Sequence, residues 1–181
     1  MTRWLVYGWS RPVYYVYGTG GTIYYEGDTV YINGSEYGTA EQYYRETEKI
    51  AEAVPEMDDK KAEEIEWLPL GVFALTSEDV NASHMYLQLA VSKEGIISGT
   101  FYNETTGAVH PVEGMVDEKT QRAVWKAADD SNSDIVMETG IFNLTRDQAE
   151  VLVHFGPEKT QTWTLVRLSE SERPQSEGRK E

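Results

Sequence analysis

Cysteine is absent from this chain of 181 residues. Its absence excludes disulfide bonds, thiolate nucleophiles and sulfur-ligated metal sites. Long apolar runs are absent too, because no segment approaches the ~18 consecutive apolar residues that a membrane-spanning helix needs. Residues 1–4 lack the apolar core of a signal peptide and lead directly into an aromatic run. We therefore expect a soluble chain with no membrane insertion, whose targeting segment lies upstream.

Positive charge is scarce. Lys and Arg number 16 against 31 Asp and Glu, which gives a formal net charge of -15. This charge repels phosphate groups, so nucleic acid and anionic membrane surfaces are poor partners. The length suits one domain of ordinary size, or a domain of ~100 residues with a smaller appendage.

The first third of the chain is rich in tyrosine, because ten of the twelve tyrosines precede residue 45. Two short β-branched and aromatic runs flank Gly27-Asp28, which predicts a β-hairpin with strands near 22–25 and 29–33. Asn33-Gly34 ends the second strand in this interpretation. An isolated hairpin is marginal in water, so it should pack against another part of the chain.

A helix is predicted directly after the hairpin, over residues 40–53. Thr39 and Gln42 have the spacing of a capping box, and Pro55 stops the helix. Its apolar face should pack against the rest of the fold through Tyr43, Tyr44, Ile50 and Val54. Residues 1–55 thus form a Tyr/Gly-rich unit of one hairpin and one helix.

Residues 67–168 have the alternation and regular turns of β-strands. Eight strands are predicted, at 68–76, 84–92, 95–103, 108–117, 121–128, 135–144, 149–155 and 160–168. Short connections make consecutive strands antiparallel neighbours, which predicts a mainly β fold with a closed eight-stranded up-and-down barrel. A two-sheet β-sandwich is the alternative. Residues 56–66 form an acidic linker with at most one short turn, and residues 169–181 a disordered tail.

Several barrel segments resemble the strand order of avidin and streptavidin: Glu94–Tyr102, Val112–Asp117, Ala123–Lys126, Glu138–Gly140 and Gln161–Trp163. The resemblance implies a calycin-like barrel. It does not extend to the biotin pocket, because Glu138 stands where that family has a stacking Trp and Phe101 where it has a pocket Tyr.

The segments Gly21–Gly34 and Gly38–Tyr43 resemble secreted bacterial mu-protocadherin-like cell-surface proteins. The resemblance implies a bacterial, extracytoplasmic location. It implies no adhesion mechanism, because the calcium-binding motifs of true cadherins are absent from this sequence.

No catalytic residue is predicted. His84, His110 and His154 form no pair at metal-ligand spacing, which argues against a zinc site. His154 alternates with apolar neighbours, so we expect it on the solvated surface. Glu113 and Glu138 could act as an acid–base pair if both pointed inward, but among so many carboxylates a solvated surface position is the favoured interpretation.

A calcium loop is the most specific chemical signal, because Asp130, Asn132 and Asp134 alternate as oxygen donors. Ile135 and Ile141 stand where such a loop requires Gly and Glu, so a polar turn without metal is favoured and no cofactor is expected.

The tyrosine-rich segment has two interpretations. One is an interaction surface for a protein, a surface polysaccharide or a second copy of the chain, formed by Tyr14, Tyr15, Tyr17, Tyr24, Tyr25 and Tyr31. The other is that these side chains pack the hairpin and the helix onto the barrel.

The favoured function is a non-enzymatic extracytoplasmic cell-surface or envelope protein that acts as a scaffold or interaction module. The alternative is a small-ligand-binding β-barrel of the avidin or lipocalin sort. The interior decides between them, since it is either open or filled by the inward residues Met85, Leu87, Leu89, Trp125, Val151, Val153 and Phe155.

Overall fold

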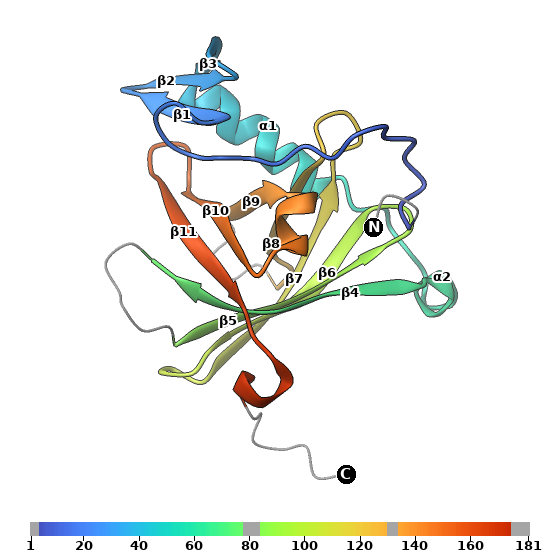
Figure 1. Cartoon of the computed structure of the whole chain (residues 1–181). Coiled ribbons are helices and arrows are strands. Elements are labelled where there is room, and N and C mark those ends of the chain that lie inside the picture. The colour runs from blue at the N-terminus through green and yellow to red at the C-terminus, as the bar shows by residue number, and fades with distance from the viewer. Residues whose placement is uncertain (1–3, 78–83, 130–133, 175–181) are drawn as a thin grey trace.

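The computed structural model describes residues 4–77, 84–129 and 134–174. Eight antiparallel strands close into a barrel in the order β10-β11-β4-β5-β6-β7-β8-β9 (Figure 1). The predicted mainly β fold with an up-and-down barrel is therefore confirmed, and the sandwich alternative is wrong. The barrel strands are β4 (Trp67–Thr76), β5 (Met85–Ser92), β6 (Ile96–Asn103), β7 (Ala108–Val116), β8 (Arg122–Ala127), β9 (Ile135–Gly140), β10 (Gln148–Phe155) and β11 (Thr160–Arg167).

The barrel is closed by pairing of its first strand with its last, in a register that places Leu75 opposite Leu165. Both side chains are buried in the main apolar core. Leu87 and Leu89 point into this core as predicted, and Val91 is buried in it with them. Alternation along the strands gives a single interior lined by inward side chains.

One predicted strand ends earlier than expected. β9 stops at Gly140, and the 3-10 helix η1 (Ile141–Thr145) occupies the rest of the predicted 135–144 strand. A Cβ at Gly140 would lie 2.7 Å from Cδ2 of Tyr15. The Asn143 side chain bonds both the backbone N–H and the backbone carbonyl of Tyr15, at 2.9 Å each. The turn into η1 is therefore built around the N-terminal segment, which a local pattern could not reveal.

The N-terminal unit contains a three-stranded sheet rather than a two-stranded hairpin: β1 (Ile23–Glu26), β2 (Thr29–Ile32) and β3 (Ser35–Thr39). Asn33 and Gly34, with φ of 52° and 80°, connect β2 to β3. Positive φ at both central residues is the requirement of the tight turn that joins twisted antiparallel strands. The predicted end of the hairpin is thus the middle of a second one.

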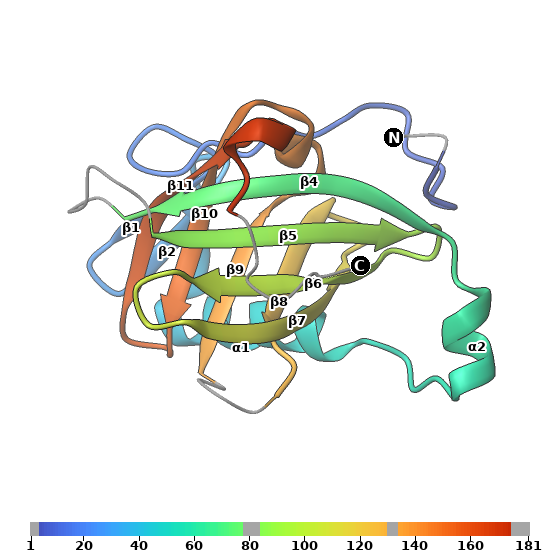
Figure 2. The ribbon, with the colours of Figure 1, turned by 90° about the horizontal axis from the view of Figure 1, so that it is seen from below.

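The predicted helix is present as α1 (Ala40–Glu52), and Thr39 and Gln42 form the expected capping box. It lies against the outside of β7, β8 and β9 and buries Tyr43, Tyr44 and Ala51 (Figure 2). The acidic segment after it contains a short second helix, α2 (Asp59–Glu64), with no buried residue. None of the helices in the described ranges is long and apolar enough to cross a membrane.

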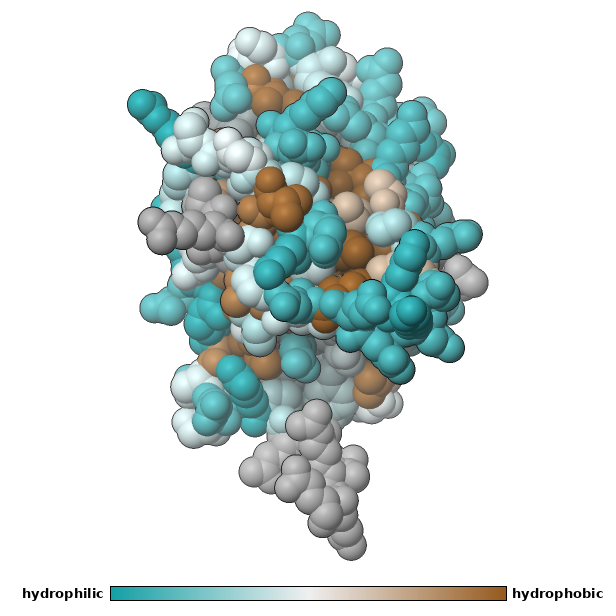
Figure 3. Space-filling model, turned by 90° about the vertical axis from the view of Figure 1, so that its right-hand side faces the viewer, coloured by the Kyte–Doolittle hydropathy of each residue, from teal (hydrophilic) through white to brown (hydrophobic). Residues whose placement is uncertain are grey.

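The two ends of the barrel differ. At one end the N-terminal segment packs against the core, where Leu5 is buried and Trp4 Nε1 donates to the Val91 carbonyl at 3.3 Å. Trp9 Nε1 holds the same segment by donating to the Glu118 carbonyl at 2.6 Å. On the side shown in Figure 3 the outer surface is mostly hydrophilic, with smaller apolar areas between. After β11 the chain makes one short 3-10 turn, η2 (Glu170–Glu172), and residues 175–181 of the predicted tail lie outside the described ranges.

Candidate functional site

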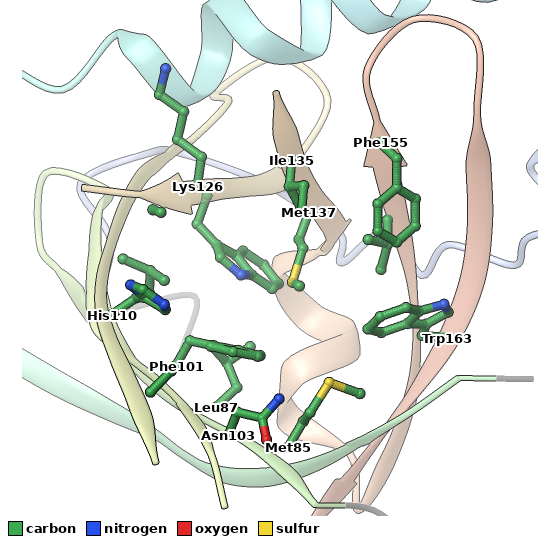
Figure 4. Close-up of a pocket in the computed structure, with 15 residues that line it drawn as sticks. Met85, Leu87, Phe101, Asn103, His110, Lys126, Ile135, Met137, Phe155 and Trp163 are labelled. Carbon is green, nitrogen blue, oxygen red and sulfur yellow. The ribbon is translucent and has the colours of Figure 1, made fainter. Parts of the chain in front are cut away.

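The other end of the barrel contains a cavity of about 340 Å³. It lies where β6, β8 and β10 finish, and inward side chains from seven strands surround it (Figure 4). Its lining consists of Met85, Leu87, Phe101, Asn103, Ala108, His110, Val112, Trp125, Lys126, Ala127, Ile135, Met137, Val153, Phe155 and Trp163. The cavity exists because the inward residues of the closed end pack fully, whereas those of this end leave space between them.

Two aromatic pairs form opposite walls of the cavity (Figure 4). On one side Phe101 and His110 stack, with centroids 6.4 Å apart and ring planes 24° apart. On the other side Phe155 and Trp163 lie with centroids 5.8 Å apart and planes tilted by 55°. Rings on two facing walls offer flat apolar surface to whatever lies between them.

The polar groups at the cavity are few. His110 Nδ1 lies 2.9 Å from Asp129 Oδ2, and Trp163 Nε1 donates to Gln161 Oε1 at 2.9 Å. The ammonium of Lys126 points away from the cavity toward α1, where it pairs with Glu52 at 2.9 Å (Figure 4). Lys126 therefore directs its charge out of the space, and His110 has the Asp129 carboxylate as a partner.

Trp125 differs from these residues. Its side chain is only 1% exposed, and its Nε1–H has no hydrogen-bond partner within the described parts of the chain. A buried donor without an acceptor costs about 1–3 kcal/mol. Among the described lining residues Trp125 is thus the one with a buried polar atom that lacks a partner.

A second polar cluster lies on the outside of the barrel, beneath α1. Glu138 accepts from Arg122 Nε at 2.7 Å and lies 2.8 Å from His154 Nε2. Arg122 also donates to the Thr47 hydroxyl on α1, and His154 Nδ1 lies 2.9 Å from Thr160 Oγ1. None of the three charged or titratable side chains is more than 5% exposed.

Electrostatics within this cluster favour the ionised forms of Glu138 and Arg122. Burial raises the pKa of Glu138, but the Arg122 charge and the hydrogen bond from His154 outweigh burial and lower that pKa to about 2. Burial lowers the pKa of Arg122, and Glu138 more than compensates, so the net direction is upward. Burial raises the pKa of Tyr17 and Tyr43 well above the ordinary value. The hydroxyls of Tyr17, Tyr25 and Tyr43 have no hydrogen-bond partner of standard geometry among the described residues.

The expectation of solvated positions for His154 and Glu138 is wrong. Both side chains do point away from the barrel interior, as alternation with Val153 and Met137 requires. They are nevertheless buried, because α1 and the tyrosine-rich segment cover this part of the outer face. Glu113 is exposed on β7, as expected, so the two carboxylates do not form an acid–base pair in a shared pocket.

The tyrosines of the predicted interaction surface separate into two groups. Tyr15 and Tyr17 are buried within the chain, so their rings serve the packing interpretation. Tyr14 is 39% exposed, with the Arg146 guanidinium 3.9 Å from its ring centroid. Tyr24 and Tyr31 are partly exposed and stack at 5.0 Å across β1 and β2, whereas Tyr25 packs edge-on against Tyr43. An interaction role stays a prediction for Tyr14, Tyr24, Tyr25 and Tyr31.

The predicted calcium candidate cannot be traced as a whole, because Asp130 and Asn132 lie outside the described residues. The main-chain oxygen of Asp134 accepts from the Tyr44 hydroxyl at 2.8 Å. Within the described ranges no group of three or more His, Asp or Glu side chains could hold a metal ion.

Sequence reasoning assigned no role to His110, Asn103, Met137 or Trp163 at the cavity. The signal for His110 was present, because Ala108, His110 and Val112 alternate along one strand and should share a face. That this face borders an open space depends on packing across the barrel, which local alternation does not contain.

Searches among family models, curated proteins and solved structures found no match to this chain. The likenesses to avidin and to protocadherin-like proteins stay sequence-based expectations.

Proposed function

We propose that the chain is a small-molecule-binding β-barrel, with its site in the open end. The observation that carries the proposal is the cavity of about 340 Å³ lined mainly by apolar and aromatic side chains. This volume lies near the lower end of the ~300–1,000 Å³ typical of small-molecule sites. An eight-stranded barrel is just wide enough to hold one small ligand.

Some of the inward residues fill the barrel interior, and others line the cavity. Leu89 and Val151 are buried in the packed half of the core. Met85, Trp125 and Phe155 line the cavity instead of filling it. The interior is therefore packed at one end and has a cavity at the other. A binding barrel requires such a cavity, whereas a purely structural scaffold does not require one.

A surface-interaction role is the second candidate, with an extracytoplasmic location as its setting. It is supported by the stacked and partly exposed pair Tyr24 and Tyr31, whose rings are almost parallel at 5°. Such a platform suits a sugar ring or an aromatic side chain of a partner. Conversion of both residues to Ala should abolish retention on cell-surface polysaccharide and leave cavity binding unchanged.

The cavity proposal is tested by blocking the site. Ala127 lines the cavity and is partly exposed, so Ala127→Trp should fill the space without disturbing the packed end. Ala74→Trp is the matched control, because Ala74 lies between the buried Phe73 and Leu75 and faces outward.

We expect ligand-observed NMR of a library of small planar and aliphatic compounds to give binders of the wild type and of Ala74→Trp, and none of Ala127→Trp. Binders that tolerate Ala127→Trp unchanged would contradict the proposed site, and a library without any binder would contradict the proposed function.

A further inference from the structure

The charges at the cavity restrict the class of ligand that can bind. The Lys126 ammonium is turned outward to Glu52, and His110 is paired with Asp129. An ionic ligand that entered this apolar space would lose its hydration without gaining an opposite charge from the described lining. The cavity therefore favours a neutral occupant.

The two aromatic walls indicate the shape of the occupant. Phe101 and His110 face Phe155 and Trp163 across the space, so a flat ring between them contacts aromatic faces and edges on both sides. Met85 and Met137 border the same space with their thioethers (Figure 4). Thioethers are polarisable and make favourable contacts with aromatic rings.

Trp125 supplies the directional element. Its Nε1–H is a strong donor that no described protein acceptor satisfies, and its side chain lines the cavity. The nitrogen is covered from solvent by its surroundings, and Met137 is the residue opposite Trp125 in the β8–β9 pairing. An unbranched Met side chain shifts at low cost, which makes it the adaptable part of this wall.

We propose that the ligand is an uncharged, planar aromatic molecule that carries a hydrogen-bond acceptor, and that Trp125 Nε1–H donates to that acceptor. This inference rests on the proposed function of the cavity. The ligand class is a small heteroaromatic or aryl carbonyl compound, held between the aromatic walls, with Met137 moving aside as the acceptor reaches Trp125. Cationic and anionic aromatics find no facing counter-charge among the described lining residues, so they should bind more weakly.

Four compounds of nearly equal shape test each part of the proposal. Quinoline has a ring acceptor, naphthalene lacks it, N-methylquinolinium has a positive charge in place of the acceptor, and 2-naphthoate carries a negative charge. Titration of the full chain above pH 7, where quinoline is neutral, should give about three- to tenfold tighter binding of quinoline than of naphthalene. N-methylquinolinium should bind more weakly than naphthalene, which equally lacks an acceptor, and 2-naphthoate should bind more weakly than quinoline.

The variant Trp125→Phe removes the donor and keeps an aromatic ring, so the preference for quinoline over naphthalene should vanish. Trp163→Phe is the matched control, because Trp163 Nε1 already donates to Gln161. That variant should keep the preference even if both affinities fall.

A second measurement covers the case in which Trp125→Phe does not fold. In the wild type labelled with ¹⁵N, quinoline should shift the Trp125 indole N–H signal downfield and naphthalene should not. Equal affinities for quinoline and naphthalene, an unmoved indole signal, or tighter binding of N-methylquinolinium would each overturn the inference. A different result is that library compounds bind to the wild type and not to Ala127→Trp while quinoline fails to bind to either. In that case the proposed ligand class is wrong and the proposed function stands.

Discussion

The covered outer face under α1 and the open end of the barrel differ in how their buried polar groups are surrounded. Under α1 the charged groups satisfy one another, since Glu138 contacts both Arg122 and His154. In the open end the Trp125 donor has no described partner, beside a space of about 340 Å³. Satisfied polar groups and dense packing favour stability, whereas an unsatisfied donor beside a cavity lowers stability and favours binding. The two regions therefore differ in the space beside the unpaired groups: the hydroxyls of Tyr17, Tyr25 and Tyr43 are packed within the chain, whereas the Trp125 donor belongs to the wall of a cavity.

The largest effect should come from breaking the cluster under α1. Glu138→Ala leaves Arg122 buried without its carboxylate, which costs about 3–5 kcal/mol of unfolding free energy. Glu113→Ala is the control, because Glu113 is exposed and its loss should change stability by less than ~0.5 kcal/mol. Urea unfolding of both variants measures the difference. Similar stabilities for the two would show that the cluster contributes nothing beyond an exposed carboxylate.

Acid should weaken the same cluster. The pKa of Glu138 is about 2 in the folded chain against an ordinary value of 4.5, so the unfolded chain binds more protons between these pH values. The contribution is fully present above about pH 4.5 and is lost as the pH falls toward 2. At pH 3 the loss is on the order of 2 kcal/mol. Between pH 6 and pH 3 the free energy of unfolding, measured with denaturant, should fall less for Glu138→Gln than for the wild type. An equal fall in both would contradict the prediction.

Filling the open end should stabilise the chain. Ala127→Leu adds apolar volume to the cavity lining, and cavity filling typically adds about 0.5–2 kcal/mol. Ala74→Leu adds the same volume to the outer face and should leave stability within ~0.5 kcal/mol. Melting temperatures report the difference. A destabilised Ala127→Leu with a normal Ala74→Leu would mean that the space cannot accept a larger side chain.

The smallest effect should come from two tyrosines of α1 that differ in bonding. Tyr44 donates to the Asp134 carbonyl at 2.8 Å, whereas the Tyr43 hydroxyl has no partner of standard geometry among the described residues. Tyr44→Phe should therefore cost about 0.5–1.5 kcal/mol, and Tyr43→Phe should be neutral or slightly stabilising. Chemical denaturation of the two variants side by side checks the order, which the reverse ranking would overturn.

Most of the fold was predictable because local sequence patterns indicate it. Alternation located the barrel strands, and the Thr39 capping box located α1. The third N-terminal strand was missed although Asn33-Gly34 carries the turn signal for it. The dipeptide was interpreted as the end of the second strand and not as the turn that connects it to a third strand.

The candidate site was less predictable because it depends on what covers each face. Alternation placed His154 and Glu138 on the outside correctly, but it could not reveal that α1 lies over them. In the same way, the pattern placed Trp125 and Phe155 inside without indicating whether the interior is filled. Both questions concern packing between segments far apart in the chain.

The pairing of β11 with β4 has a consequence for the kinetics of folding. Thr76 and Thr164 meet in this seam although 88 residues separate them. The Asn143 contact with Tyr15 spans 128 residues. Contacts of such long range carry a large loop-closure entropy and slow the search for the native state. During synthesis one edge of β4 stays unpaired until its partner β11 has been made. Nascent chains can therefore associate through this edge until β11 emerges.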